Sequence, residues 1–334
     1  MSETPVPANP QSPRRLRWWP GILIFLVALV AFGWVRAQAD WPFQKRNLES
    51  ARVIVIATGL LLAWWIFFSR ARWRLRLGVL ALFVALVAAV PALFRIRGVS
   101  GDLLPILEPR WAKHELSSAS PTNKPVALPA SANNLNSFPQ FYGPNRDGVL
   151  TGLKLETNWT AHPPGLLWKQ KIGAAWSGFA AVGEIAVTQE QRGEDECVVA
   201  YDLKTGRQLW LHADHTRYNT VIAGDGPRAT PTILSNRVFT TGANGRLNCL
   251  DLASGKVIWT RDVLTENKGK VPSWGIAGSP LILDDLVLAH GGDNTGHTLF
   301  AYRWSDGQPA WTAGTASPSY ASPILATLGG VRQV

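Results

Sequence analysis

Three segments of this chain repeat one pattern, and each ends in a tryptophan, at Trp210, Trp259 and Trp311. In each segment a short apolar run leads into a four-residue polar turn that closes on glycine, and a second run then carries the tryptophan. The tryptophans are 49 and 52 residues apart. A period of this length is typical of repeat architectures, because their units cannot bury a core alone and pack against their neighbours.

Each repeat predicts four antiparallel strands, which we call A to D. The glycines of the turns, Gly206, Gly255 and Gly307, are expected to supply the positive φ of a hairpin between strands C and D. A second hairpin precedes each of these, as at Ser235-Asn236, and provides strands A and B. Four such strands make the blade of a β-propeller. The expected blades span about 178–210, 229–259 and 278–311, and a fourth begins at about 321.

A lone strand D is expected ahead of the first blade, at residues 166–172, with Trp168 in the position of the repeated tryptophan. Closed propellers use such an early strand to complete their last blade, and three blades do not close a ring. We therefore expect an incomplete propeller, and a chain that is a fragment of a longer protein with its other blades beyond residue 334. An oligomer that completes the ring, or a short open solenoid, is the alternative.

These motifs carry a resemblance to a known family. The pattern A-x-D-x-x-T-G-x-x-x-W at residues 200–210 resembles the repeat of pyrroloquinoline-quinone (PQQ)-type propellers, which include quinoprotein dehydrogenases and the propeller lipoprotein of the outer-membrane β-barrel assembly machinery. Residues 141–148, 188–193 and 226–231 resemble more closely the membrane-anchored, mostly uncharacterised bacterial members. The resemblance covers residues 138–334, and it implies a fold more strongly than a function.

The first part of the chain has a different character. Apolar runs at about 18–35, 53–68 and 77–94 contain no acidic or basic residue, and each is close to the length that spans a hydrocarbon core of about 30 Å. They predict a membrane anchor at residues 18–97 with three transmembrane helices. Residues 98–137, rich in Ser, Pro, Ala and Asn, are expected to be a flexible linker to the propeller at 138–334.

Arginines predict the orientation of this anchor. Arg14, Arg15 and Arg17 precede the first run, and four more arginines lie between the second and third runs, on the same side. The positive-inside rule then gives a cytoplasmic tail at residues 1–17 and places the propeller on the periplasmic side of a bacterial inner membrane. The first run also reads as a signal peptide cleaved near Ala39, and that alternative likewise exports the propeller.

Charge separates the two halves in the same way. The net charge of +10 lies within residues 1–113, since the remainder has 18 basic and 18 acidic residues. The basic balance therefore belongs to the membrane anchor, and no nucleic-acid partner is expected.

Few residues suggest chemistry. Cys197 and Cys249 are expected to be separate core thiols, with a structural disulfide in an oxidising compartment as the alternative. His212, Asp214 and His215 have metal-ligand side chains, but we expect a solvated loop between blades, and we predict neither a metal site nor catalytic residues.

The best candidate site lies three residues before each strand A, where a propeller channel opens. This register contains Trp176, Arg228 and Tyr320, with Ala277 in the third blade, and Trp274 lies close by. Aromatic rings and an arginine suit a planar or anionic ligand, so these four side chains form a candidate axial, cofactor-binding channel. Packing between blades is the structural alternative.

These features favour two functions. The first is a membrane-tethered, extracytoplasmic propeller that acts as a binding or scaffold module, in envelope assembly, with the lipid bilayer and other envelope proteins as partners. The second is a PQQ-dependent membrane-bound dehydrogenase. The resemblance alone implies PQQ with calcium for the second, with Glu190 or Asp293 as oxygen donors.

Overall fold

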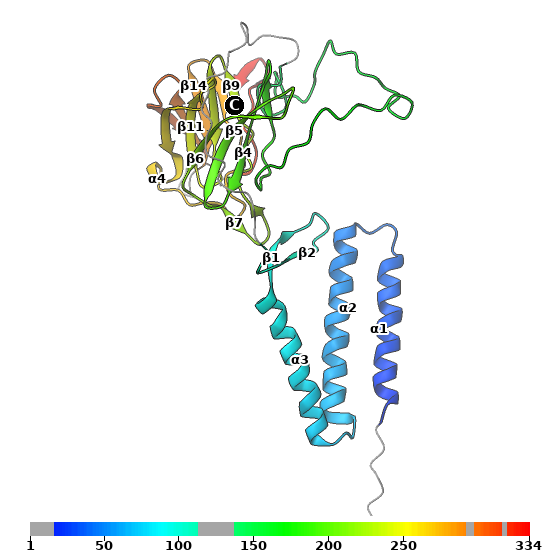
Figure 1. Ribbon diagram of the computed structural model, residues 1–334. Helices are drawn as coiled ribbons and strands as arrows, with labels where there is room; N and C mark the ends of the chain where they lie inside the picture. Colours follow the sequence, from blue (N-terminus) through cyan, green and yellow to red (C-terminus); the bar gives the residue numbers. More distant parts are fainter. Residues whose placement is uncertain (1–16, 113–136, 292–296, 316–318) are drawn as a thin grey trace, which may run out of the picture. The chain divides into compact units, whose positions relative to one another are not determined.

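A computed structural model describes residues 17–112, 137–291, 297–315 and 319–334. The chain divides into two compact units, Met1–Ala112 and Lys113–Val334, and each is described by itself (Figure 1).

The first unit contains three long helices. They are α1 (Trp19–Ala37), α2 (Phe43–Ala63) with its π-helical continuation η1 (Trp64–Phe68), and α3 (Trp73–Leu93). Each is long and apolar enough to cross a membrane by length and composition. Helix α2 begins well before the apolar run predicted at residue 53. Its first turns are polar but still helical, because they contain good helix formers and an ion pair between Arg52 and Glu49.

A hairpin follows these helices. It consists of β1 (Phe94–Val99) and β2 (Pro105–Pro109), which pair in antiparallel fashion. Arg95 Nε donates to Glu108 Oε2 at 3.0 Å across the two strands. This hairpin occupies part of the segment predicted as a linker, and the remainder of that segment, residues 113–136, lies outside the described residues.

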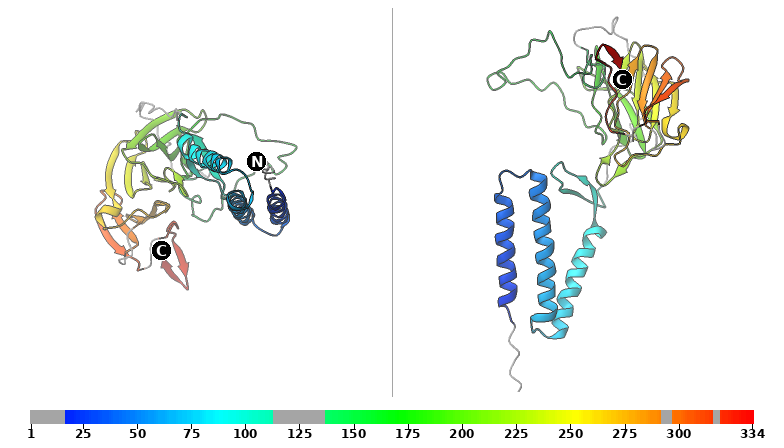
Figure 2. Two further views of the ribbon diagram at one scale, coloured as in Figure 1. Left: turned by 90° about the horizontal axis from the view of Figure 1, so that it is seen from below. Right: turned by 180° about the vertical axis from the view of Figure 1, so that it is seen from behind.

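The second unit is built of four-stranded antiparallel sheets, in which each strand pairs with its neighbour in sequence. Three such sheets occur in the described residues, and Figure 2 shows them following one another along an arc. The first sheet contains β3 (Ala180–Val182), β4 (Ile185–Arg192), β5 (Asp195–Asp202) and β6 (Gln208–Asp214). The second contains β9 (Thr232–Leu234), β10 (Arg237–Thr241), β11 (Arg246–Asp251) and β12 (Val257–Asp262). The third contains β13 (Leu281–Leu283), β14 (Leu286–His290), β15 (Leu299–Arg303) and β16 (Pro309–Ala313).

Shorter elements lie between and after these sheets. A two-stranded ribbon, β7 (Asn219–Thr220) and β8 (Gly224–Asp225), joins the first sheet to the second, and α4 (Val263–Glu266) follows the second. Strands β17 (Ala326–Leu328) and β18 (Val331–Gln333) form a hairpin after the third. The arrangement of N-terminal helices followed by four-stranded antiparallel sheets is consistent with part of a propeller of the predicted class.

Three of the repeated tryptophans, Trp168, Trp210 and Trp259, join consecutive units. Each indole N–H donates to a carbonyl in the C–D turn of the following sheet, and each ring covers the glycine of that turn, which has a φ near +70°. The bonds are Trp168 to Leu203 O at 2.9 Å, Trp210 to Leu252 O at 2.8 Å, and Trp259 to Trp304 O at 3.0 Å. Trp311, in the last four-stranded sheet, is 39% exposed.

The segment around Trp168 differs from its prediction in one respect. Residues 166–172 form no strand, although Trp168 makes the expected contact. The following residues are fastened individually, because Ala174 forms a bridge with Gln191 and the Gly173 N–H donates to the Glu190 carboxylate. Leu166 and Leu167 are largely exposed, so this stretch has no apolar face that packing would hold in a regular strand.

The core runs between the sheets. One buried cluster joins Val187 and Trp210 of the first sheet to Ile233, Val238 and Leu250 of the second. A second cluster joins β10–β12 to β14 and β15 in the same way. Burial at the joints is therefore what holds neighbouring units together.

Residues 137–148 contact the first strand of the first two sheets and the residues just before the first strand of the third. Phe138 pairs with Ala181, and the carbonyl of Pro139 accepts from Ile233 N at 2.7 Å. The guanidinium of buried Arg146 donates to the carbonyls of Pro280 at 2.9 Å and Ser279 at 3.1 Å. Burial lowers the pKa of Arg146 to about 10. This segment therefore fastens three sheets that the chain reaches one after another.

Candidate functional site

The candidate side chains lie in the connections that lead into strand A. In an antiparallel blade the A–B and C–D turns share one end, and the B–C and D–A connections share the other. Trp176 precedes β3, Arg228 lies between β6 and β9, Trp274 between β12 and β13, and Tyr320 between β16 and β17. We call this end of the sheets the D–A end. Trp176 is 66%, Trp274 51% and Tyr320 45% exposed.

Two of these aromatic side chains contact each other. The rings of Trp274 and Tyr320 are 6.2 Å apart, centre to centre, at an angle of 51°. Trp176 lies beside the connection that holds Arg228, because its backbone N–H donates to Pro227 O at 2.9 Å. The structure thus places Arg228, Trp274 and Tyr320 in successive D–A connections and Trp176 in the segment that leads into β3. A contact pairs the rings of Trp274 and Tyr320.

Arg228 is held by its own loop. Its guanidinium stacks over Tyr218 at 4.5 Å and donates to the carbonyls of Ala223, Gly224 and Gly226. Burial lowers its pKa. Tyr218, which sequence reasoning missed, donates in turn to Ser273 O at 2.6 Å and so links two successive connections. The contacts of Arg228 in the structure are therefore structural, and its role in binding a ligand stays a prediction.

Glu196 is a buried carboxyl group close to Arg228. The side chain is buried between the first two sheets, and its Oε2 accepts from the Ala243 N–H at 3.1 Å. Burial raises its pKa to about 7, and the neighbouring Asp214 carboxylate adds to the rise, while Arg228 and the bond from Ala243 oppose it. The burial of Glu196 could have been predicted from the alternation of side chains along a strand, because Glu196 shares a strand face with the inward residues Val198 and Ala200.

Glu190 belongs to a closed network. Arg192 Nη2 lies 2.6 Å from Glu190 Oε1, and the Tyr201 hydroxyl donates to the same oxygen at 2.8 Å. The other carboxylate oxygen accepts from Gly173 N. The carboxylate is fully buried, so the oxygen-donor role expected for Glu190 does not fit its structural contacts. Asp293, the other candidate donor, lies outside the described residues.

The histidine cluster was predicted as a loop, but its first members belong to strand β6. His212 and Asp214 lie within that strand, because it continues past Trp210 and pairs with β5. The His212 Nε2 and Asp214 Oδ2 atoms are 3.4 Å apart. His215 faces elsewhere, with its Nδ1 2.9 Å from Asp195 Oδ1. Across the described ranges, no three side chains of His, Cys, Asp or Glu come together in a way that could hold a metal.

The two cysteines are free and buried, as predicted. Burial raises the pKa of Cys197 to about 12 and that of Cys249 to about 11. Both thiols are therefore protonated at neutral pH, and this makes them poor nucleophiles.

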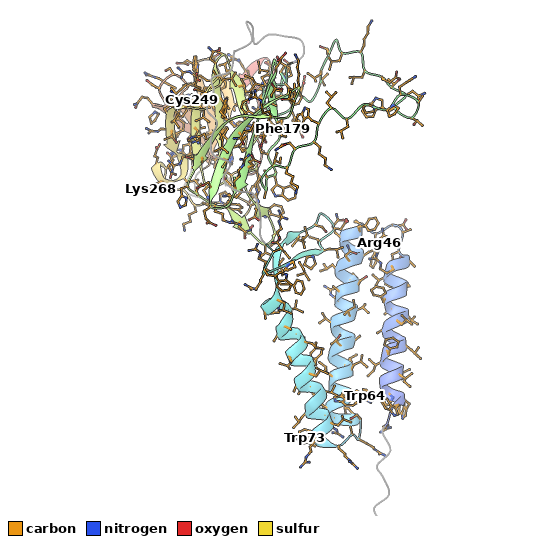
Figure 3. The ribbon with its side chains drawn as sticks, in the orientation of Figure 1. Arg46, Trp64, Trp73, Phe179, Cys249 and Lys268 are labelled. Carbon is orange, nitrogen blue, oxygen red and sulfur yellow. The ribbon has the colours of Figure 1, made fainter. Side chains whose placement is uncertain are left out.

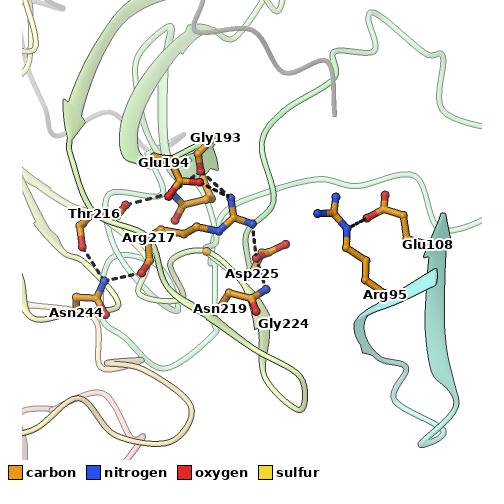
Figure 4. Close-up of polar contacts among 12 residues, drawn as sticks. Arg95, Glu108, Gly193, Glu194, Thr216, Arg217, Asn219, Gly224, Asp225 and Asn244 are labelled. Atoms are coloured by element: carbon orange, nitrogen blue, oxygen red, sulfur yellow. Dashed lines mark hydrogen bonds and ion pairs between the residues drawn. The ribbon is translucent and has the colours of Figure 1, made fainter. Parts of the chain in front are cut away.

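Polar contacts hold the connections of the D–A end in place (Figure 4). Arg217 donates to Gly193 O at 3.0 Å and to Asp225 Oδ1 at 3.1 Å, so it joins a B–C turn to the β7–β8 ribbon. Asn244 of the second sheet donates to Thr216 Oγ1 at 2.8 Å. These bonds give the exposed aromatic residues a fixed base.

A family comparison agrees with the repeat pattern. Residues 194–330 match a PQQ-type family model described as "Outer membrane protein assembly factor BamB". The resemblance inferred from the tryptophan and glycine motifs is therefore confirmed for this part of the chain. No curated protein matches the chain.

The solved structures to which the chain is similar are distant in sequence. Quinohemoprotein alcohol dehydrogenase from Comamonas testosteroni is 19% identical, with 55% of this chain and 28% of that chain covered and a TM-score of 0.41. BamB from Moraxella catarrhalis is 21% identical, with 47% and 55% covered and a TM-score of 0.31. A europium-containing methanol dehydrogenase is 20% identical, with 43% and 25% covered and a TM-score of 0.34. The chain spans about a quarter of the length of the dehydrogenases and about half that of BamB.

Proposed function

We propose that this protein is a membrane-tethered, extracytoplasmic propeller that binds other envelope proteins and acts as a scaffold in envelope assembly. The observation that carries the proposal is the row of exposed aromatic side chains at the D–A end, Trp176, Trp274 and Tyr320, on repeats that match the assembly-factor family. Large aromatic residues on a rigid base are typical of the hot spots of protein interfaces.

The polar groups near these rings support binding rather than chemistry. Arg228 donates to backbone carbonyls, and the Glu190 carboxylate accepts from Arg192, Tyr201 and Gly173. Both side chains thus serve to hold loops and strands. The D–A end presents the exposed rings of Trp176, Trp274 and Tyr320 to a partner, and such ring surface suits apolar side chains of another protein.

The candidate residues fit PQQ with calcium poorly. An anionic quinone needs a cation with free donors and a calcium ion needs several oxygen ligands, but Arg228 and Glu190 already have internal partners. We therefore derive no catalytic step through this cofactor, and the dehydrogenase alternative becomes an outcome of the test below.

The location in the cell is part of the proposal. The three helices are apolar enough to span a membrane, and the arginines between the second and third favour a cytoplasmic position for that loop. With three spans, the repeats then lie on the periplasmic side of the inner membrane.

A photo-crosslinking amino acid placed in living cells tests the proposal. Substitution at Trp274 should give adducts with specific envelope proteins, whereas the same group at Leu203, which is 43% exposed at the opposite end of the sheets, should not. Equal adducts from both positions would contradict an interface at the D–A end. Binding of PQQ with calcium at micromolar Kd, about −8 kcal/mol, abolished by Arg228→Ala, would support the dehydrogenase instead.

A further inference from the structure

An apolar groove lies between α1 and α2 of the first unit. Its volume is about 420 Å³, and nine aliphatic side chains line it, five from α1 and four from α2. Ala28 and Ala31 on α1 face Ala57 on α2, and these small side chains leave space that larger ones would fill. The groove is as apolar as an acyl chain.

The groove continues into a second hollow of different chemistry. This hollow has a volume of about 310 Å³ and shares Ile24 and Leu60 with the first. Its lining adds Arg17, Trp19 and Trp64. We call the two together the α1–α2 groove, which is aliphatic along most of its length and cationic and aromatic at one end.

Trp64 brings an unsatisfied donor to this end. Its indole Nε1 is buried without a hydrogen-bond partner in the described part of the chain, whereas the neighbouring Trp65 donates to Arg76 O at 3.3 Å. The ring is held against Gly21, where a Cβ would lie 2.6 Å from it. Trp64 also begins the π-helical turn η1, a departure from α-helix that is frequent at functional sites. A ligand with an acceptor would satisfy this N–H.

The same end of the helices is strongly cationic. Arg17 lies beside the loop that carries Arg70 and Arg72, because its backbone N–H donates to Ser69 O at 3.1 Å, and the sequence contains no acid between Glu49 and Asp102. Figure 3 shows Trp64 and Trp73 near this end and Arg46 at the other. Positive charge at the edge of a membrane, with no acidic partner among the described residues around it, attracts anionic lipids.

We propose that the α1–α2 groove binds one anionic phospholipid. An acyl chain occupies the aliphatic part, and the phosphate accepts hydrogen bonds from Arg17 and from the indole of Trp64. Charge-assisted bonds from a guanidinium to a phosphate are among the stronger polar interactions, and the Trp64 N–H gains the partner that the chain itself does not supply. The proposal concerns the first unit alone and is independent of what the repeats bind.

Native mass spectrometry of the full chain in mild detergent tests this proposal. Phosphatidylglycerol is expected to remain bound, in a ratio of one per chain, under conditions that remove phosphatidylcholine. Arg17→Gln and Trp64→Phe, which keeps the ring and removes the N–H, are each expected to weaken phosphatidylglycerol binding about ten-fold. Arg36→Gln, at the other end of α1, is the matched control and should leave binding unchanged.

A groove-filling variant tests the acyl chain separately. Ala28→Leu should displace the lipid while all arginines remain. Equal retention of phosphatidylcholine and phosphatidylglycerol, or unchanged binding in Arg17→Gln, would overturn the proposal. Loss in Arg17→Gln with full binding in Ala28→Leu would show a surface ion contact only and would also overturn it. If Trp64→Phe fails to fold, the other two variants decide.

Discussion

The ring of Trp210 lies directly against the backbone of Gly255, so that a Cβ on residue 255 would be 2.7 Å from the ring carbon Cδ2. We expect Gly255→Ala to lower the free energy of unfolding by about 3 kcal/mol, because the methyl group forces the two sheets apart and residue 255 has a φ of +70°. Gly193→Ala is the control, since Gly193 also has a positive φ but no atom within 4 Å of its Cβ position. Thermal unfolding in detergent measures both, and equal losses would contradict the contact.

The tryptophans themselves should differ according to whether they are docked. Trp210 is fully buried, so Trp210→Ala should lower the free energy of unfolding by about 3 to 5 kcal/mol. Trp311 is 39% exposed, so Trp311→Ala should lower the free energy of unfolding by about 1 kcal/mol or less. At about 2–4 °C of Tm per kcal/mol, the two variants are easily distinguished. A larger loss at Trp311 would show that it, too, is buried in the protein as it functions.

Glu196 should make stability depend on pH near neutrality. Its folded pKa of about 7 is above the unfolded value of 4.5, so the fold favours the protonated form. The stabilisation is complete below pH 4.5 and is lost as pH rises through 7, by about 2 to 4 kcal/mol. Glu196→Gln should remove this part of the pH profile of Tm, whereas Glu194→Gln, which lacks the burial, should not. An unchanged profile in Glu196→Gln would contradict the assignment.

The buried ion pair Glu190–Arg192 and the exposed pair Glu184–Lys204 should contribute very differently to the free energy of unfolding. Glu190→Gln leaves the buried Arg192 without its carboxylate and should lower the free energy of unfolding by about 3 to 5 kcal/mol. Glu184→Gln breaks a pair with Lys204 in which both side chains are exposed, and it should leave the free energy of unfolding almost unchanged. Urea titration compares them, and similar losses would contradict the burial of Glu190.

Reporter fusions test the proposed orientation. Alkaline phosphatase fused after residue 334 should be active in a bacterial host, because three spans that begin in the cytoplasm export the repeats. A fusion in the loop near Arg72 should be inactive. The reverse pattern would place the repeats in the cytoplasm and exclude an envelope partner.

The repeats could be predicted because their signal is local and periodic. A turn that needs glycine, a tryptophan four residues later and alternating apolar residues together define two strands and the contact between units, and Trp210, Trp259 and their turns follow the prediction. The apolar runs located the helices equally well. The start of α2 was missed because helix propensity, unlike membrane insertion, extends into polar sequence.

The candidate site was less predictable because it depends on contacts between distant segments. A register count placed Arg228 in a D–A connection but gave no information about which carbonyls its guanidinium binds. The burial of Glu190 likewise depends on Gly173 and Tyr201, which approach it from other segments. Nothing in the local sequence distinguishes a carboxylate in such a network from one that faces solvent.

Residues 137–148 can bind the three sheets only after those sheets have been synthesised. Arg146 leaves the ribosome first, yet its acceptor at Pro280 lies 134 residues further along the chain. Residues 137–148 therefore stay without their final partners while the sheets form one after another. Long-range pairing of this kind is slow and leaves apolar surface exposed in the meantime. Translation speed and chaperones should consequently affect the yield of this protein more than the strength of any single contact in its finished fold.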